Sequence, residues 1–99
     1  MSVMIGIDPH KALHAACAID RRETELAEVV VRSGPRQLDQ LLGWAAGFEH
    51  RTWAIESASG LGYLLSQQLL AQGEVVVDVP AMLSSRARLF GAVEQERRK

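Results

Sequence analysis

Val-Met-Ile-Gly-Ile-Asp at residues 3–8 is the stretch that decides the fold of this chain. Four of its six residues are large and apolar, which is typical of a buried strand, and Pro9 ends the run because it has no backbone N–H. The stretch closes with Asp8. A second apolar run, at residues 53–55, is followed in the same way by Glu56. An ionised carboxylate beside apolar packing is unfavourable unless a positive group compensates it, so both strand ends require a reason.

The residues that follow predict an antiparallel hairpin and then a helix and a strand. Residues 12–20 and 24–32 flank a polar loop of hairpin size, although the alanines of 12–20 would also suit a helix. Ser-Gly-Pro at 33–35 ends the hairpin, and leucines at helical spacing follow as far as Gly47. Residues 51–56 then form a strand.

The second half of the chain predicts a helix, a strand and a further helix. Ser59 suits the N-cap of a helix over residues 60–72, and Gly73 suits its C-terminal end. Residues 75–79 form a strand, and residues 81–93 have an amphipathic pattern. Five leucines should form the apolar face of the 60–72 helix: Leu61, Leu64, Leu65, Leu69 and Leu70.

This order of elements predicts a single α/β domain over residues 1–99, since the length suits one core. Three consecutive strands prefer antiparallel pairing, and strands that alternate with helices prefer right-handed parallel crossovers. A mixed five-stranded sheet flanked by helices satisfies both rules. The order is the ribonuclease H-like one, in which the first strand is central and pairs with the fourth, giving the strand order 3-2-1-4-5.

The composition excludes several classes of protein. Hydrophobic residues make up 47%, charged residues 23%, and the formal net charge is −1, as in an ordinary globular protein. Cys17 is the only cysteine, which excludes an internal disulfide and fits a reducing compartment. No apolar run approaches the ~20 residues needed to span a bilayer, and no signal-peptide pattern is present. We therefore expect a cytoplasmic protein with no membrane partner.

The two acidic strand ends predict a metal site if their strands are parallel neighbours. Asp8 and Glu56 would then lie at the same carboxyl edge of the sheet, where open sheets bind ligands. Adjacent strands are ~4.8 Å apart, so the two carboxylates could share one ion or bridge a pair. Oxygen ligands favour Mg²⁺ or Mn²⁺ over zinc, and such ions serve phosphodiester cleavage. A plainer alternative stays open, in which Asp8 caps a turn and Glu56 contacts solvent.

Three segments together carry a family resemblance: Met-Ile-Gly-Ile-Asp-Pro-His-Lys at 4–11, Ile-Glu-Ser-Ala-Ser-Gly-Leu-Gly-Tyr at 55–63, and residues 73–80. The chain resembles the N-terminal half of DEDD-type insertion-sequence transposases (the insertion-sequence 110 family, which includes the Piv DNA invertases). The resemblance implies a RuvC-like domain in which four acidic residues bind divalent metal for DNA strand cleavage and rejoining. Asp8 falls on the first acidic position and Glu56 on the second.

The same resemblance implies that this sequence is a fragment. The family's third and fourth acids are an aspartate pair that would begin where residues 94–99 end, so two of four ligands are expected to be missing. We expect the fragment to fold without nuclease activity, and the full-length protein to use two ions, Mg²⁺ or Mn²⁺. Asp78 lies within a strand and is interpreted as structural, and Glu94 and Glu96 as solvated. The resemblance further implies a C-terminal domain with a nucleophilic serine and a structured guide RNA.

Basic residues are the candidates for nucleic-acid contacts. Lys11 matches a basic residue of the family and would contact phosphate, although a plain surface lysine fits equally. A terminal cluster suits DNA backbone contacts, as it would a severed helix end: Arg86, Arg88, Arg97, Arg98 and Lys99. Apolar surface bared on the 81–93 helix predicts a homo-oligomer.

The remaining candidates have plainer interpretations. His10 and His14 lack cysteine partners, which argues against zinc. Cys17 is expected to be a small core residue, and Tyr63 to serve packing. Two other functions remain open. One is an actin-like ATPase or sugar-kinase subdomain, although Pro-His-Lys at 9–11 replaces its Gly- and Ser-rich phosphate loop. The other is a non-catalytic nucleic-acid-docking or dimerisation module.

Overall fold

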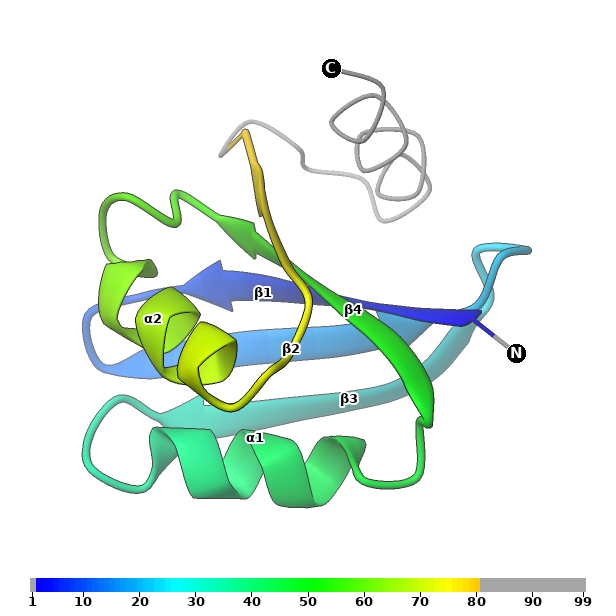
Figure 1. Ribbon diagram of the computed structural model, residues 1–99, viewed down its shortest axis with the longest axis horizontal. Coiled ribbons are helices and arrows are strands. Elements are labelled where there is room, and N and C mark those ends of the chain that lie inside the picture. Colours follow the sequence, from blue (N-terminus) through cyan, green and yellow to red (C-terminus); the bar gives the residue numbers. More distant parts are fainter. Residues whose placement is uncertain (1, 81–99) are drawn as a thin grey trace.

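The structure, a computed structural model, describes residues 2–80, and the expected helix over 81–93 lies outside them. Five strands and two helices alternate as the sequence predicts (Figure 1). In chain order they are β1 (Ser2–Pro9), β2 (Leu13–Ile19), β3 (Glu25–Arg32), α1 (Gln37–Ala45), β4 (His50–Glu56), α2 (Tyr63–Ala71) and β5 (Val76–Val79). Among these residues no helix is long and apolar enough to cross a membrane.

The strands form one mixed sheet in the order β3-β2-β1-β4-β5, which confirms the predicted topology. β1 is antiparallel to β2, β2 is antiparallel to β3, and β4 runs parallel to both β1 and β5. β1 continues one residue further than predicted, because Pro9 still pairs with His14 of β2. The alanine-rich segment is therefore a strand, and the helical alternative for it is wrong.

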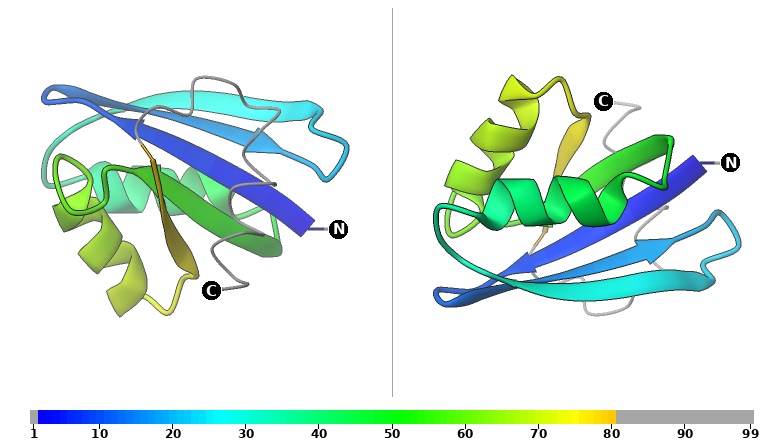
Figure 2. Two further views of the ribbon diagram at one scale, coloured as in Figure 1. Left: turned by 90° about the horizontal axis from the view of Figure 1, so that it is seen from above. Right: turned by 90° about the horizontal axis from the view of Figure 1, so that it is seen from below.

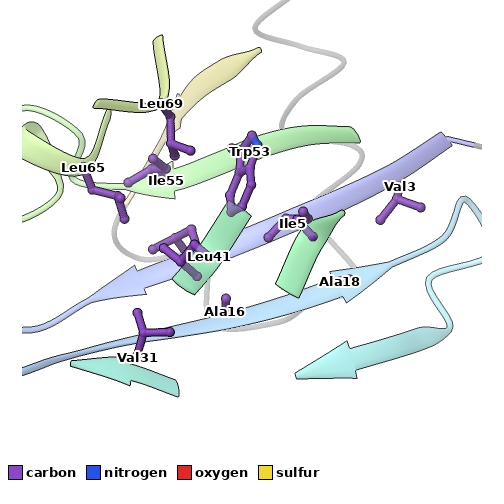
Figure 3. Packing of buried hydrophobic residues seen from close by; sticks show 12 residues of the cluster. Val3, Ile5, Ala16, Ala18, Val31, Leu41, Trp53, Ile55, Leu65 and Leu69 are labelled. Carbon is purple, nitrogen blue, oxygen red and sulfur yellow. The ribbon is translucent and has the colours of Figure 1, made fainter. Parts of the chain in front are cut away.

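Both helices cover the same face of the sheet (Figures 1 and 2). Alternate residues of each strand point to that face, which is why Ile5 and Ile7 of β1 and Trp53 and Ile55 of β4 are fully buried there. The helices contribute leucines to the same cluster, as Figure 3 shows for Leu41, Leu65 and Leu69. This layer of side chains is the main core.

The opposite face of the sheet carries a smaller apolar cluster. Met4, Ile19, Ala54 and Val79 are buried there, with Cys17 and Val77 packed at its margin. Neither α1 nor α2 lies on this face (Figure 2). β1 is thus apolar on both sides, as its continuous hydrophobic sequence predicts for a central strand.

Helix α2 departs most from the sequence prediction. It begins at Tyr63, its N-cap is Gly62, and no side chain caps it, so the assignment of Ser59 as N-cap is wrong. Only part of the predicted apolar face is buried: Leu65 and Leu69 enter the core, whereas Leu61, Leu64 and Leu70 are exposed. Tyr63 is also exposed, so its predicted packing role is wrong. The end is as expected, with Gly73 at φ 81° after the last turn.

A partly buried ion pair joins the start of β4 to the connection before β5. Arg51 donates to both Glu74 oxygens, from Nε at 2.7 Å and from Nη2 at 3.1 Å, and the buried Trp53 donates to Glu74 Oε1 at 2.7 Å. Arg51 Nη1 also donates to the carbonyls of Ala45 and Phe48 at the end of α1. These bonds lower the pKa of Glu74, with the Arg51 hydrogen bond as the largest cause. The pair therefore fixes α1 and β5 to β4.

Candidate metal centre at the carboxyl edge of the sheet

Asp8 and Glu56 lie side by side where the parallel strands β1 and β4 end. The register pairs Ile7 with Ile55, and the two acids are the next residue on each strand. Strand alternation places Asp8 on the face of Met4 and Glu56 on the face of Ala54, which both belong to the smaller cluster. The two carboxylates therefore project from the same face of the sheet, at the edge where the sequence predicts them.

The pKa of Glu56 is affected by the nearby carboxylate of Asp8. Its pKa is raised, first because the carboxyl is partly buried, then because of the negative charge of Asp8 and a side-chain hydrogen bond with it. His10 acts weakly in the opposite direction. Two carboxyl groups that exchange a hydrogen bond cannot both be ionised without repulsion. A cation between them would remove that repulsion.

The connection after β4 keeps Glu56 at the edge. Ser57 has a left-handed backbone (φ 52°), which turns the chain sharply, and its carbonyl accepts hydrogen bonds from Gly60 at 2.8 Å and Gly62 at 3.2 Å. Asp78 Oδ1 accepts the backbone N–H of Ala58 at 3.1 Å. Asp78 belongs to the opposite face from Glu56, because its neighbours Val77 and Val79 lie in the smaller cluster. Its contact is structural, as the sequence analysis proposes.

Gly62 is a site residue that the sequence analysis did not identify. A Cβ at this position would lie 2.6 Å from Ile55 Cγ2, 3.2 Å from the Glu56 carbonyl oxygen and 3.3 Å from Pro9 Cγ. The start of α2 therefore packs directly against the ends of β1 and β4, and only glycine permits the approach. Glycines before a helix are a signal for such a contact, but the pattern does not say what they approach.

His10 is the second residue that was assigned no role at the site. Its Nε2 lies 3.1 Å from Asp8 Oδ2, with His10 63% and Asp8 56% exposed. The signal was its position two residues after Asp8, since such residues share a side of an extended chain. Lys11 is exposed in the same β1–β2 connection. The terminal basic candidates, Arg86 to Lys99, lie outside the described residues, as do Glu94 and Glu96.

A second group of possible ligands lies on β2 and β3. Cys17, Glu25 and Glu28 have ligand atoms within 4.8 Å of one another, and Cys17 Sγ donates to Glu25 Oε1 at 3.4 Å. Cys17 is half-buried at the margin of the smaller cluster instead of within the core as predicted. Both glutamates are exposed, and exposed acids of this kind are common without a metal. We assign no site there.

The donors at the edge fit a hard divalent cation. Asp8 and Glu56 offer carboxylate oxygens only, and their mutual repulsion and the partial burial of Glu56 are relieved when a cation binds. His10 is the one nitrogen donor beside them among residues 2–80, and it contacts Asp8. Oxygen ligands of this kind are typical of Mg²⁺ or Mn²⁺ sites.

Comparisons with known proteins agree with this fold. The family model of DEDD transposases of the insertion-sequence 110 type matches residues 5–99. Among solved structures, the chain is similar to T. thermophilus RuvC in complex with Holliday junction substrate, with TM-score 0.61, 18% identity, and coverage of 83% of this chain and 66% of that one. It is also similar to the large terminase nuclease from thermophilic phage G20c, with TM-score 0.60, 14% identity, and coverage of 97% and 54%. A search of curated proteins finds no match.

The chain matches only part of each of these two solved structures. The chain spans just under two thirds of the RuvC chain and about half of the terminase nuclease. At such low identity the two structures support the fold, which is RuvC-like and hence ribonuclease H-like, as predicted from the order of elements. A divalent metal ion is the cofactor class that this fold and the matching family imply.

Proposed function

Since the chain belongs to the DEDD transposases of the insertion-sequence 110 type, we propose that Asp8 and Glu56 bind a divalent metal ion for DNA strand cleavage and transfer. The observation that carries the proposal is the pairing of the two carboxyl groups at the carboxyl ends of adjacent parallel strands. Asp78, in contrast, accepts a backbone N–H and belongs to the other face of the sheet.

The metal is Mg²⁺ or Mn²⁺, and the whole protein holds two ions. When bound, such ions polarise the phosphoryl oxygens and lower the pKa of attacking water. The residues of this chain would hold the metal. Asp8 and Glu56 would supply oxygen ligands, and His10 restrains one oxygen of Asp8. Two carboxylates alone hold two ions weakly, and the family pattern has two further acids. The 99-residue chain is therefore expected to bind metal without cleaving DNA.

DNA is the proposed partner, and the similarity to RuvC, whose structure contains Holliday junction substrate, supports it. Lys11 in the β1–β2 connection and the basic residues between Arg86 and Lys99 are proposed to contact phosphates. A structured guide RNA, a homo-oligomeric assembly and a cytoplasmic location are proposed for the whole protein on the family resemblance and the single cysteine.

The competing functions are less well supported. An ATPase of the actin type needs a glycine-rich phosphate loop after the first strand, whereas here Pro9 pairs with His14 and the chain turns directly into a hairpin. A non-catalytic docking module would have no need for a paired, partly buried acid at Glu56, since a neutral glutamine would avoid the repulsion.

Metal titration tests the proposal. Mn²⁺ is added to the 99-residue chain and to its Asp8→Asn and Glu56→Gln variants, with binding followed by calorimetry. Glu49→Gln is the matched control, because Glu49 is exposed beyond the opposite end of β4. We expect Asp8→Asn and Glu56→Gln to abolish binding and Glu49→Gln to leave it unchanged. Equal Mn²⁺ affinity in all four proteins would refute the site, and DNA cleavage by the full-length Asp8→Asn protein would refute its role.

A further inference from the structure

A polar network with a buried centre lies next to the β1–β2 connection. It consists of His14 on β2, Ser33 after β3, Gln37 on α1 and Gln68 on α2. His14 and Gln37 are each only 3% exposed, although the face they occupy is otherwise apolar. Buried polar groups are retained at the expense of apolar packing, so a network of four requires a reason.

The donor and the acceptor of each hydrogen bond in this network can be assigned. The backbone N–H of Gly34 can only donate, so the Gln37 atom that receives it at 3.3 Å is Oε1. His14 Nε2 lies 2.9 Å from the same oxygen and must therefore carry a proton. Gln37 Nε2 in turn donates to Gln68 Oε1 at 2.8 Å. His14 Nδ1 is left buried without a hydrogen-bond partner among residues 2–80.

This assignment decides what the Ser33 hydroxyl does. His14 Nε2 also lies 3.1 Å from Ser33 Oγ, and because this nitrogen carries its proton, the serine oxygen can only accept, sharing the one N–H with Gln37 Oε1. The serine proton is then free for another acceptor. It is donated to the backbone carbonyl of His10 at 3.2 Å.

Ser33 thus holds the β1–β2 connection at two points. Its hydroxyl binds the His10 carbonyl, and its backbone N–H donates to the Ala12 carbonyl at 2.9 Å. Within the connection, His10 N donates to Leu13 O at 2.9 Å. The backbone of His10 is therefore fixed on both sides, and its imidazole lies against Asp8 Oδ2.

We propose that His14 and Ser33 are positioning residues for the metal centre, acting through His10, which restrains Asp8 Oδ2 and leaves Oδ1 for the metal. This inference rests on the proposed metal-binding function of Asp8. The His10 side chain is exposed and can rotate, but a fixed backbone keeps its imidazole within reach of Asp8 and so favours the hydrogen bond between them. Residues that orient a metal ligand from behind raise the affinity of the site without touching the ion.

A double-mutant cycle separates positioning from general stability. Mn²⁺ affinity and thermal unfolding are measured for Ser33→Ala, His10→Ala and the double variant. Each single substitution should weaken Mn²⁺ binding on the order of tenfold, and the double variant should be no weaker than either, because both remove the same restraint. Ser33→Thr, which keeps the hydroxyl, should restore the affinity.

Ser66→Ala is the matched control, since Ser66 is also buried but its hydroxyl has no hydrogen-bond partner among the described residues. It should leave Mn²⁺ affinity unchanged. A Ser33→Ala protein with a lower melting temperature but unchanged Mn²⁺ affinity would overturn the inference. So would a double variant whose loss of Mn²⁺ affinity equals the product of the two single losses. Asp8→Asn in the same titration separates the two proposals. Unchanged binding in Asp8→Asn refutes the metal site itself, whereas loss there with full binding in Ser33→Ala refutes only the positioning role.

Discussion

Replacing Glu56 with glutamine should stabilise the metal-free chain and abolish its response to metal. Glutamine has nearly the shape of glutamate but carries no charge, so it relieves both the burial of the carboxylate and its repulsion by Asp8. Most substitutions of partly buried residues destabilise a protein, which makes a gain at this position diagnostic.

The size of the gain follows from the geometry of the sheet. Two unit charges on adjacent strands, ~4.8 Å apart, repel by about 1 kcal/mol in water and about 3 kcal/mol at an effective dielectric constant of ~20. The lower value applies because the Asp8 side chain is 56% exposed. A gain of about 1 kcal/mol raises the melting temperature of a domain of this size by about 4–8 °C.

The pH dependence has a definite sign. The pKa of Glu56 is raised on folding, so between its ordinary and raised values the folded chain binds more protons than the unfolded chain. The contribution of Glu56 to the free energy of unfolding therefore falls as pH rises through that window, from about pH 4 upward. Glu56→Gln lacks this titration, and its stability relative to the native chain should increase as pH rises above about 4.

Thermal unfolding with and without Mn²⁺ is the assay. A ligand at ten times its dissociation constant stabilises the native chain by about 1.4 kcal/mol, and Glu56→Gln should lose this response. Asp8→Asn should behave in the same way, because it removes the other charge, and Glu49→Gln should behave as the native chain. A Glu56→Gln protein that is less stable than the native chain, or that still gains stability from Mn²⁺, would refute the reasoning.

Three further substitutions test individual features of the fold and of the site. Glu74→Gln should lower the free energy of unfolding by about 2–4 kcal/mol in urea titrations near neutral pH, because it removes a bidentate partner of Arg51. Since folding lowers the pKa of Glu74, this difference should shrink in acid, and a pH-independent difference would contradict the assignment. Gly62→Ala should cost about 1–3 kcal/mol and weaken Mn²⁺ binding, because its Cβ would press on Ile55 and the Glu56 backbone, whereas Gly43→Ala, with open space around it, should be neutral or stabilising. Glu23→Gly should stabilise the chain by on the order of 0.5–1 kcal/mol and raise its melting temperature by a few degrees, because Glu23 has a left-handed backbone (φ 65°) that glycine adopts without strain. Arg22→Gly is the control and should lower the melting temperature, because the backbone of Arg22 is not left-handed.

The strand order could be predicted from the sequence because the hydrophobic pattern of each strand indicates how far that strand is buried in the sheet. Residues 3–5 and Ile7 are apolar, and these residues of β1 are indeed buried on both faces of the sheet. The alternation of helix and strand then leaves few permitted connections. The pairing of Asp8 with Glu56 follows from that topology alone, since parallel neighbours end at the same edge.

The sequence could not predict where α2 begins or which of its leucines are buried. The left-handed Ser57 turns the chain and its carbonyl accepts two glycine N–H groups, so the residues before Tyr63 form a turn. Leucine spacing reports an apolar helix but not what covers it, and Leu64 is exposed whereas Leu65 is buried. The contact of Ser33 with His10 was equally hidden, because it depends on a register that joins residues 23 positions apart.

The two glutamates associated with β4 show why one end of the strand is a site and the other is not. At its start, Glu74 receives donors from Arg51 and Trp53, its pKa is lowered, and its charge stabilises the fold. At the end of β4, Glu56 is partly buried and lies beside a second acid, Asp8. Both features raise its pKa, so its charge opposes folding. Carboxylates whose pKa is raised by burial and by a second acid are found frequently at functional sites. The raised pKa of Glu56 therefore supports the proposed metal site at this edge, as a physical argument separate from the family similarity.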